Sequence, residues 1–250
     1  MILASHTCSK LHSYFGLCWM AACCLLLPGI SRAADVSGRV ELVFSKDPNV
    51  RKHMDFSGVV VWLESLSGQL NLPPKAHAEM IQKNKTFAPH VLAITLGTVV
   101  SFPNYDPIFH NAFSNYDGQI FDIGLYPPGT TRAIGFRREG VVRVFCNIHP
   151  TMSAVIVVLK SPYFAVSDKN GGFQIAGVPP GSYRIHVFHE RATEQTLAGL
   201  THTLEISGDP VQLAPISVSE SGYLQLPHTN KYGKDYPPAA DALGYSGTKP

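Results

Sequence analysis

Short hydrophobic runs separated by turn residues are the feature that most constrains the fold of this 250-residue chain. The runs are rich in Val, Ile and Phe, and Gly, Pro and Asn interrupt them. Tyr183, Ile185 and Val187 alternate with polar residues, which is the period of a strand with one buried face. Many evenly spaced short strands are typical of β-sandwiches and barrels. The sequence therefore predicts an all-β protein, with strands at 38–43, 58–64, 91–95, 141–145, 153–159, 173–175, 183–187 and 203–206.

The first 33 residues have the pattern of a secretory signal peptide. Lys10 precedes an uncharged apolar run from Leu17 to Leu27, and small residues follow as far as Ala34. This run is shorter than the stretch of about 20 apolar residues that a membrane-spanning helix needs. We therefore expect cleavage near Ala33 or Ala34, and a periplasmic or secreted protein with no membrane span. An uncleaved anchor and a lipoprotein cleavage box ending at Cys23 are the alternatives.

The composition of the mature chain excludes some partners. Without residues 1–33, 18 Lys and Arg residues face 18 Asp and Glu residues, so there is no basic surface for nucleic acid. Four of the five cysteines lie in the predicted signal peptide, and Cys146 alone remains. An exported chain with one thiol has no internal disulfide, so Cys146 is either a buried core residue or a reactive one.

Cys146, His149 and Met152 form a C-x-x-H-x-x-M loop between two expected strands. Thiolate and thioether are soft ligands that suit copper, and imidazole also binds copper. A blue-copper site places two histidines and a cysteine in one plane, with a weak axial methionine. The second histidine must come from elsewhere, and His110 in a turn-rich segment is the candidate. Zinc is an alternative metal, but a thioether is a poor ligand for it.

Residues 86–159 resemble a cupredoxin, the plastocyanin-like fold, and the C-x-x-H-x-x-M spacing is that of amicyanin. The chain also resembles the periplasmic cupredoxins of bacterial methylamine utilisation. The resemblance implies that His110, Cys146, His149 and Met152 bind copper, and that Asn111 ties the two ligand loops together. The other residues that carry the resemblance are Phe87-Ala88-Pro89, 97–102, Asn104-Tyr105-Asp106, Phe121-Asp122 and 126–130.

A second resemblance points to a transthyretin-type sandwich of the carboxypeptidase-regulatory-like kind. Residues 168–185 contain a D-x-x-G turn, a strand, a Pro-Pro-Gly turn and another strand. The opening strands of that family are missing from this stretch, but residues 36–67 contain similar ones. We therefore expect a cupredoxin Greek-key β-sandwich plus a second small β-sandwich.

The strands of the second sandwich come from two separate parts of the chain, and this sets the expected domain order. A cupredoxin domain at 72–159 interrupts a sandwich made of 36–70 and 160–218, and 219–250 is an extended, poorly packed tail. In the main alternative, residues 36–70 pack on the cupredoxin itself. Two local alternatives are a short helix rather than strands at 75–82, and an edge strand at 223–226.

The function that these patterns favour is single-electron transfer by an exported mononuclear type 1 copper protein. The implied partner is a redox protein, such as a cytochrome c or a periplasmic oxidoreductase. No second histidine cluster, catalytic triad or carboxylate pair indicates an enzyme. Copper storage or delivery is an alternative, as is a metal-free structural or carbohydrate-associated β-sandwich.

Overall fold

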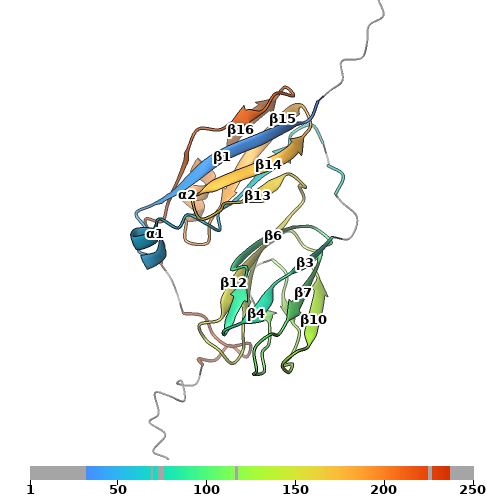
Figure 1. Ribbon diagram of the computed structural model, residues 1–250, viewed down its shortest axis with the longest axis vertical. Helices are drawn as coiled ribbons and strands as arrows, with labels where there is room; N and C mark the ends of the chain where they lie inside the picture. Colours follow the sequence, from blue (N-terminus) through green and yellow to red (C-terminus); the bar gives the residue numbers. More distant parts are fainter. Residues whose placement is uncertain (1–31, 69, 73–75, 116–117, 225–226, 237–250) are drawn as a thin grey trace, which may run out of the picture. The chain divides into compact units, whose positions relative to one another are not determined.

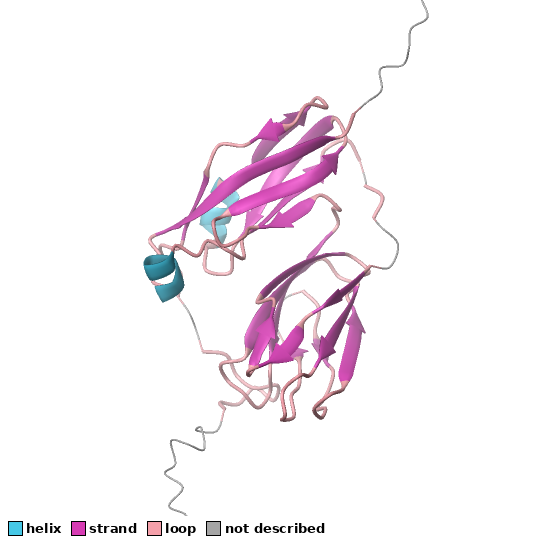
Figure 2. Cartoon of the chain, viewed as in Figure 1, coloured by secondary structure: helices cyan, strands magenta, loops and turns pink. Residues whose placement is uncertain are grey.

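The computed structural model describes residues 32–68, 70–72, 76–115, 118–224 and 227–236. Nearly all of the predicted signal peptide and the end of the predicted tail lie outside these residues. Strands dominate the described part (Figure 2), which also has two short helices, α1 (Pro48–His53) and α2 (Glu194–Gly199). None of its helices is long and apolar enough to cross a membrane. The predicted all-β class is confirmed.

Two sheets formed by the N-terminal and C-terminal parts of the chain enclose one core (Figure 1). In the first sheet, β1 pairs with its three neighbours, and in the second the order is β13-β2-β15-β16. The first sheet contains β1 (Ala34–Val43), β14 (Gly172–Val178), β17 (Val211–Gln212) and β18 (Ile216–Ser219). The second contains β2 (Val60–Ser65), β13 (Phe164–Val166), β15 (Gly181–Phe188) and β16 (His202–Ile206).

Alternation along the strands explains this core. In β15, Tyr183, Ile185 and Val187 are buried while Arg184 is exposed, as the sequence predicts. The D-x-x-G turn that precedes β14 is held by the Asp168 side chain, which accepts hydrogen bonds from the backbone of residues 170 and 172. Gly171 in this turn has φ +82°, and a Cβ there would collide with the Val40 carbonyl oxygen, so the turn requires glycine.

A second pair of sheets encloses a separate core within residues 77–159. One sheet has the order β10-β7-β3 and the other the order β6-β12-β11-β8-β9. The first contains β3 (His77–Glu79), β7 (Val99–Pro103) and β10 (Thr131–Gly135). The second contains β6 (Val91–Thr95), β8 (Phe113–Ser114), β9 (Phe121–Asp122), β11 (Gly140–Phe145) and β12 (Ser153–Leu159). A separate hairpin joins β4 (Ile81–Lys83) to β5 (Thr86–Ala88).

The structure decides between the alternatives at 75–82 and corrects the expectation for the tail. The described residues of 75–82 contain β3 and the start of β4, so the strand alternative holds there rather than the helix. The tail is not poorly packed throughout, because residues 227–236 make specific hydrogen bonds to the loop between β11 and β12. Tyr223 and Leu224 belong to no strand, and the other two residues of the possible edge strand at 223–226 lie outside the description.

Candidate metal centre

Antiparallel pairing of β11 and β12 frames the loop that carries three of the predicted ligands. The register ends with Phe145 opposite Ser153, so residues 146–152 form a short closed connection. Two backbone hydrogen bonds fix it: Cys146 N–H donates to the Met152 carbonyl at 3.1 Å, and Met152 N–H donates to the His149 carbonyl at 3.0 Å.

His110 reaches the same loop from a different part of the sheet. Its backbone makes an isolated antiparallel bridge with Tyr126, with hydrogen bonds of 3.2 and 2.9 Å in the two directions. The Tyr126 hydroxyl is buried and donates to the Phe102 carbonyl, which anchors this bridge in the core. The bridge to Tyr126 and the surrounding core together restrict the fully buried His110 side chain.

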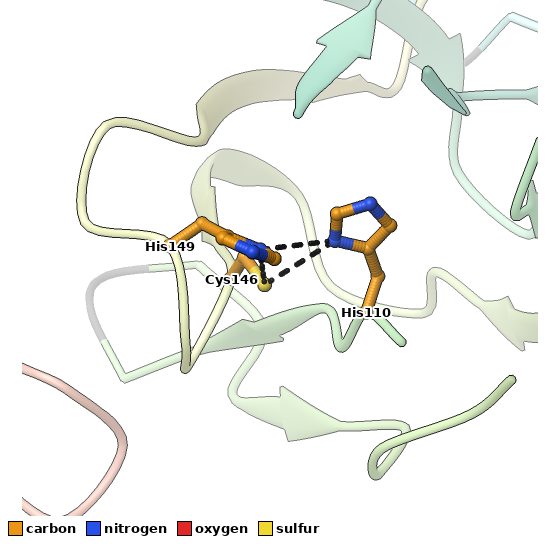
Figure 3. Close-up of side chains that lie close together, drawn as sticks. All are labelled: His110, Cys146 and His149. Atoms are coloured by element: carbon orange, nitrogen blue, oxygen red, sulfur yellow. Dashed lines mark hydrogen bonds between the residues drawn. The ribbon is translucent and has the colours of Figure 1, made fainter. Parts of the chain in front are cut away.

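The side chains of His110, Cys146 and His149 point toward one another (Figure 3). The two Nδ1 atoms lie 3.1 Å apart, and the Cys146 sulfur lies 3.9 Å from Nδ1 of His110 and 3.5 Å from Nδ1 of His149. Three atoms with these separations share a centre about 2 Å from each, close to the bonds of about 2.0–2.3 Å between zinc and nitrogen or sulfur ligands. The triangle therefore fits one first-row metal ion.

The chemistry of these donors favours copper. Two imidazole nitrogens and a thiolate in one plane are the donor set of blue-copper sites, for which a trigonal His₂Cys arrangement is diagnostic. Structural zinc sites instead surround the ion with four tetrahedral ligands. The described cysteine, histidine and carboxylate residues supply three converging donors here, so the donor set fits copper better than structural zinc.

The orientation of His110 is set by Asp106, a residue to which the sequence analysis assigned no role. His110 Nε2–H donates to Asp106 Oδ2 at 2.7 Å, which leaves Nδ1 to face the cluster. The same carboxylate accepts backbone N–H groups from Asn84 and Lys85 at 2.6 and 2.8 Å. The sequence signal was an acid four residues before the histidine, inside a turn-rich segment.

The surroundings of Cys146 have opposing effects on the pKa of its thiol. Burial raises the pKa of the thiol, because the fully buried sulfur is removed from water. Backbone N–H groups of Ile148, Asn111 and His149 lower that pKa by hydrogen bonding to the sulfur. Burial has the larger effect, so the pKa of the thiol is raised overall, and the N–H groups offset part of that rise in favour of the thiolate, the form that binds a metal.

His149 is kept in the form that binds a metal. Burial lowers its pKa, and the neighbouring His110 lowers it further, so the imidazole favours its neutral state. Its side chain is only half-buried, in contrast to His110. His149 is therefore the member of the cluster that lies nearest to solvent.

Asn111 connects the two segments that carry the cluster. Its side-chain oxygen accepts the Asn147 backbone N–H at 3.1 Å, and its amide donates to Asp122 at 2.7 Å. The family resemblance implies such a connection for Asn111, and its part in a metal site stays a prediction. The bond joins the chain beside His110 to the residue directly after Cys146, so the two loops cannot separate without breaking it.

Met152 lies at the end of the same loop. It is fully buried and belongs to the same hydrophobic core as Cys146. Its backbone bonds to Cys146 and His149 place it beside two members of the cluster. Its assignment as the axial ligand stays a prediction.

Comparison with known proteins finds partial likenesses. No family model matches the chain. The Methylamine utilization protein MauL of Methylorubrum extorquens is 40% identical over 60 residues, which are 24% of this chain and 53% of that protein. The chain thus spans about half the length of this curated relative.

Three solved structures also show likenesses. A purple cupredoxin from Nitrosopumilus maritimus is 26% identical, covering 33% of this chain and 99% of its own, with a TM-score of 0.30. Amicyanin from Paracoccus versutus is 18% identical, covering 40% and 97%, with a TM-score of 0.31. A copper-containing nitrite reductase from Thermus scotoductus is 23% identical, covering 48% and 28%, with a TM-score of 0.32.

The sequence motifs, the two sheets and the converging ligand loop all belong to one segment of the chain. Its core contains the buried Cys146 at the end of β11, and the bridge to Tyr126 brings His110 to the same place. These features, together with the likeness to the methylamine utilization protein, support a cupredoxin-like domain in this part of the chain.

Proposed function

We propose that this chain is an exported mononuclear type 1 copper protein that transfers single electrons. The observation that carries the proposal is the triangle formed by Nδ1 of His110, Sγ of Cys146 and Nδ1 of His149. When bound, copper supplies a one-electron couple at this position. The three donor atoms already converge, which supports a site in which little of the chain must rearrange when its charge changes.

Electron transfer is favoured over storage or delivery by the way the donors are held. Asp106 orients His110, and Asn111 joins the two ligand loops, so the donors are fixed on both sides. A site that releases its metal readily needs ligands that can move apart. A substrate reaction is not part of this proposal.

The proposed route for electrons passes the half-buried His149. Three exposed apolar side chains lie in the segments that carry the ligands: Tyr105, Phe109 and Ile148, of which Tyr105 is 60% exposed. With the near-zero net charge of the predicted mature chain, they favour an apolar contact with a redox protein in the periplasm. Such a contact depends weakly on salt, because charge steering contributes little to it. A cytochrome c or a periplasmic oxidoreductase is the class of partner that we propose.

Copper loading of the mature chain tests the proposal. We expect an intense visible absorption from thiolate-to-copper charge transfer, lost in Cys146→Ser and in His149→Gln. His202→Gln is the matched control, because His202 is an exposed histidine outside the cluster. The wild-type protein should pass repeatedly between its oxidised and reduced states without losing metal to a chelator. A fully coloured Cys146→Ser protein would overturn the copper assignment, and loss of copper at each reduction would favour storage or delivery.

A further inference from the structure

The C-terminal segment 227–236, here called the strap, contacts the loop that carries Cys146 and His149. The sequence predicts this part of the chain to be poorly packed, but the structure describes three separate contacts with the loop. They reach Cys146, Asn147 and Pro150 of the 146–152 loop.

The first contact ends on a cluster residue. The Tyr236 hydroxyl donates to the backbone carbonyl of Cys146 at 2.9 Å. Its ring also packs edge-on against His228, at 5.2 Å between ring centroids. The hydrogen bond fixes the peptide group that follows the Cys146 side chain, and so limits the rotation that would move the sulfur.

The second contact spans the loop. The His228 ring stacks on Phe145, with centroids 4.0 Å apart and an interplanar angle of 26°. His228 Nε2–H donates to the Pro150 carbonyl at 2.8 Å. Phe145 precedes Cys146 and Pro150 follows His149, so one side chain of the strap joins the two ends of the ligand segment.

The third contact reaches the connection between the two ligand loops. The Lys231 backbone N–H donates to the Asn147 side-chain oxygen at 3.0 Å, and its ammonium group lies 2.8 Å from Asp122 Oδ2. Asp122 accepts a hydrogen bond from Asn111, whose own side-chain oxygen accepts the Asn147 N–H. Lys231 therefore closes a ring of hydrogen bonds that also contains Asn111, Asp122 and Asn147.

The strap has a local structure of its own. The Asn230 side-chain oxygen accepts backbone N–H groups from Tyr232 and Lys234, at 2.9 and 3.2 Å. Gly233 N–H donates to the Asn230 carbonyl at 2.9 Å. These bonds form a turn that presents Lys231 to the loop, which lowers the entropy lost when the contacts form.

We propose that the strap is a positioning element of the metal centre, with His228, Lys231 and Tyr236 as its positioning residues. It holds the 146–152 loop so that Cys146 and His149 keep their separation with and without a metal. This inference rests on the proposed function for its effect on copper, but its effect on the loop itself is independent of any metal. The strap slows the opening of the loop, and through the loop it slows the loss of copper.

Hydrogen exchange on the metal-free chain tests the hold on the loop. We expect the amides of Cys146, Asn147 and Met152 to exchange about fivefold faster in Tyr236→Phe, the factor that one hydrogen bond of ordinary net strength contributes. Removal of residues 227–250 should produce a larger increase at the same amides. Tyr223→Phe is the matched control, because it removes a hydroxyl from a tyrosine that precedes the strap.

Copper release to excess EDTA tests the effect on the centre. The copper-loaded Tyr236→Phe and Lys231→Met proteins should lose the metal about fivefold faster than the intact chain, with a broader thiolate band and an unchanged far-ultraviolet circular dichroism spectrum. If both variants match the Tyr223→Phe control in loop exchange and in copper release, the strap does not position the loop. If the intact chain has no thiolate band but loop exchange rises as expected, the proposed function fails and the strap's hold on the loop stands.

Discussion

Nε2 of His110 lies 2.7 Å from Oδ2 of Asp106, and this contact determines which nitrogen of the histidine faces the cluster. Asp106 is itself held by the backbone N–H groups of Asn84 and Lys85. The carboxylate thus joins the β4–β5 hairpin to a cluster residue that comes from a different part of the chain. Backbone hydrogen bonds and the contact with His110 together hold the pKa of Asp106 below its usual value against the opposing effect of burial.

Replacement of Asp106 should weaken metal binding without removing any ligand. In Asp106→Ala, His110 loses the partner that fixes its ring, and we expect copper affinity to fall by about 10–100-fold. A competition titration against a chelator of known affinity measures this. Asp209→Ala, at an exposed carboxylate, is the control. Equal affinities in the two folded variants would contradict the role of Asp106.

Replacement of Met152 separates its predicted role as an axial ligand from its role in the core. Met152→Leu conserves volume and should cost less than about 1.5 kcal/mol of stability, whereas Met152→Ala should cost about 2–5 kcal/mol. We expect both variants to keep the thiolate band and to have a shifted reduction potential, because the weak axial ligand tunes the potential of such a site rather than building it. Voltammetry of the leucine variant decides the point, and an unchanged potential would mean that Met152 serves the core alone.

The buried carboxylate of Glu220 should make the folded state sensitive to acid. Burial alone would raise its pKa, but hydrogen bonds from His189, Arg191 and Ser45 lower it from 4.5 to about 2. The ionised Glu220 therefore stabilises the folded state above pH 4.5, and this stabilisation is lost as the pH falls toward about 2. Denaturant unfolding across this range should show a falling free energy of unfolding.

A variant isolates this contribution. Glu220→Gln cannot ionise, so its free energy of unfolding should be lower than that of the wild type near neutral pH and should change less between pH 4.5 and 2. Glu139→Gln, at a carboxylate whose side chain is 46% exposed, should follow the wild-type profile. Parallel profiles for Glu220→Gln and the wild type would show that another group causes the acid sensitivity.

We also propose that residues 36–70 and 160–218 form one folding unit. β2 lies between β13 and β15, and β1 pairs with β14, β17 and β18, so the N-terminal strands are central to both sheets. A fragment of residues 160–218 should be unfolded alone, because without β1 and β2 only β15 and β16 keep a hydrogen-bonded partner among its described strands, and a two-stranded pair is marginal in water. Joining it to 36–70 through a short linker should restore a folded, metal-free domain, and a fragment of residues 72–160 should bind copper.

Circular dichroism and amide exchange of the three fragments check this domain organisation. If 160–218 folds alone while 72–160 does not, residues 36–70 belong to the cupredoxin-like domain.

Local pattern alone identified the all-β class, several of the longer strands and the loop that contains three of the candidate ligands. Alternation in 183–187 and the apolar runs at 141–145 and 153–159 identify strands because a half-buried or fully buried strand leaves its period in the sequence. The C-x-x-H-x-x-M spacing places three potential ligands in one loop, because the flanking strands pair directly.

Tertiary structure decided the contacts that join distant segments. The contacts of Asp106 with the backbone of Asn84 and Lys85, and of Tyr236 with the Cys146 carbonyl, depend on how loops pack after the sheets have formed. A tail rich in Pro, Gly and Tyr has no period of its own, so its sequence predicts poor packing although His228 stacks on Phe145. Periodicity records which face of an element is buried, but it does not record which remote segment covers that face, because that choice depends on the free energy of the whole fold.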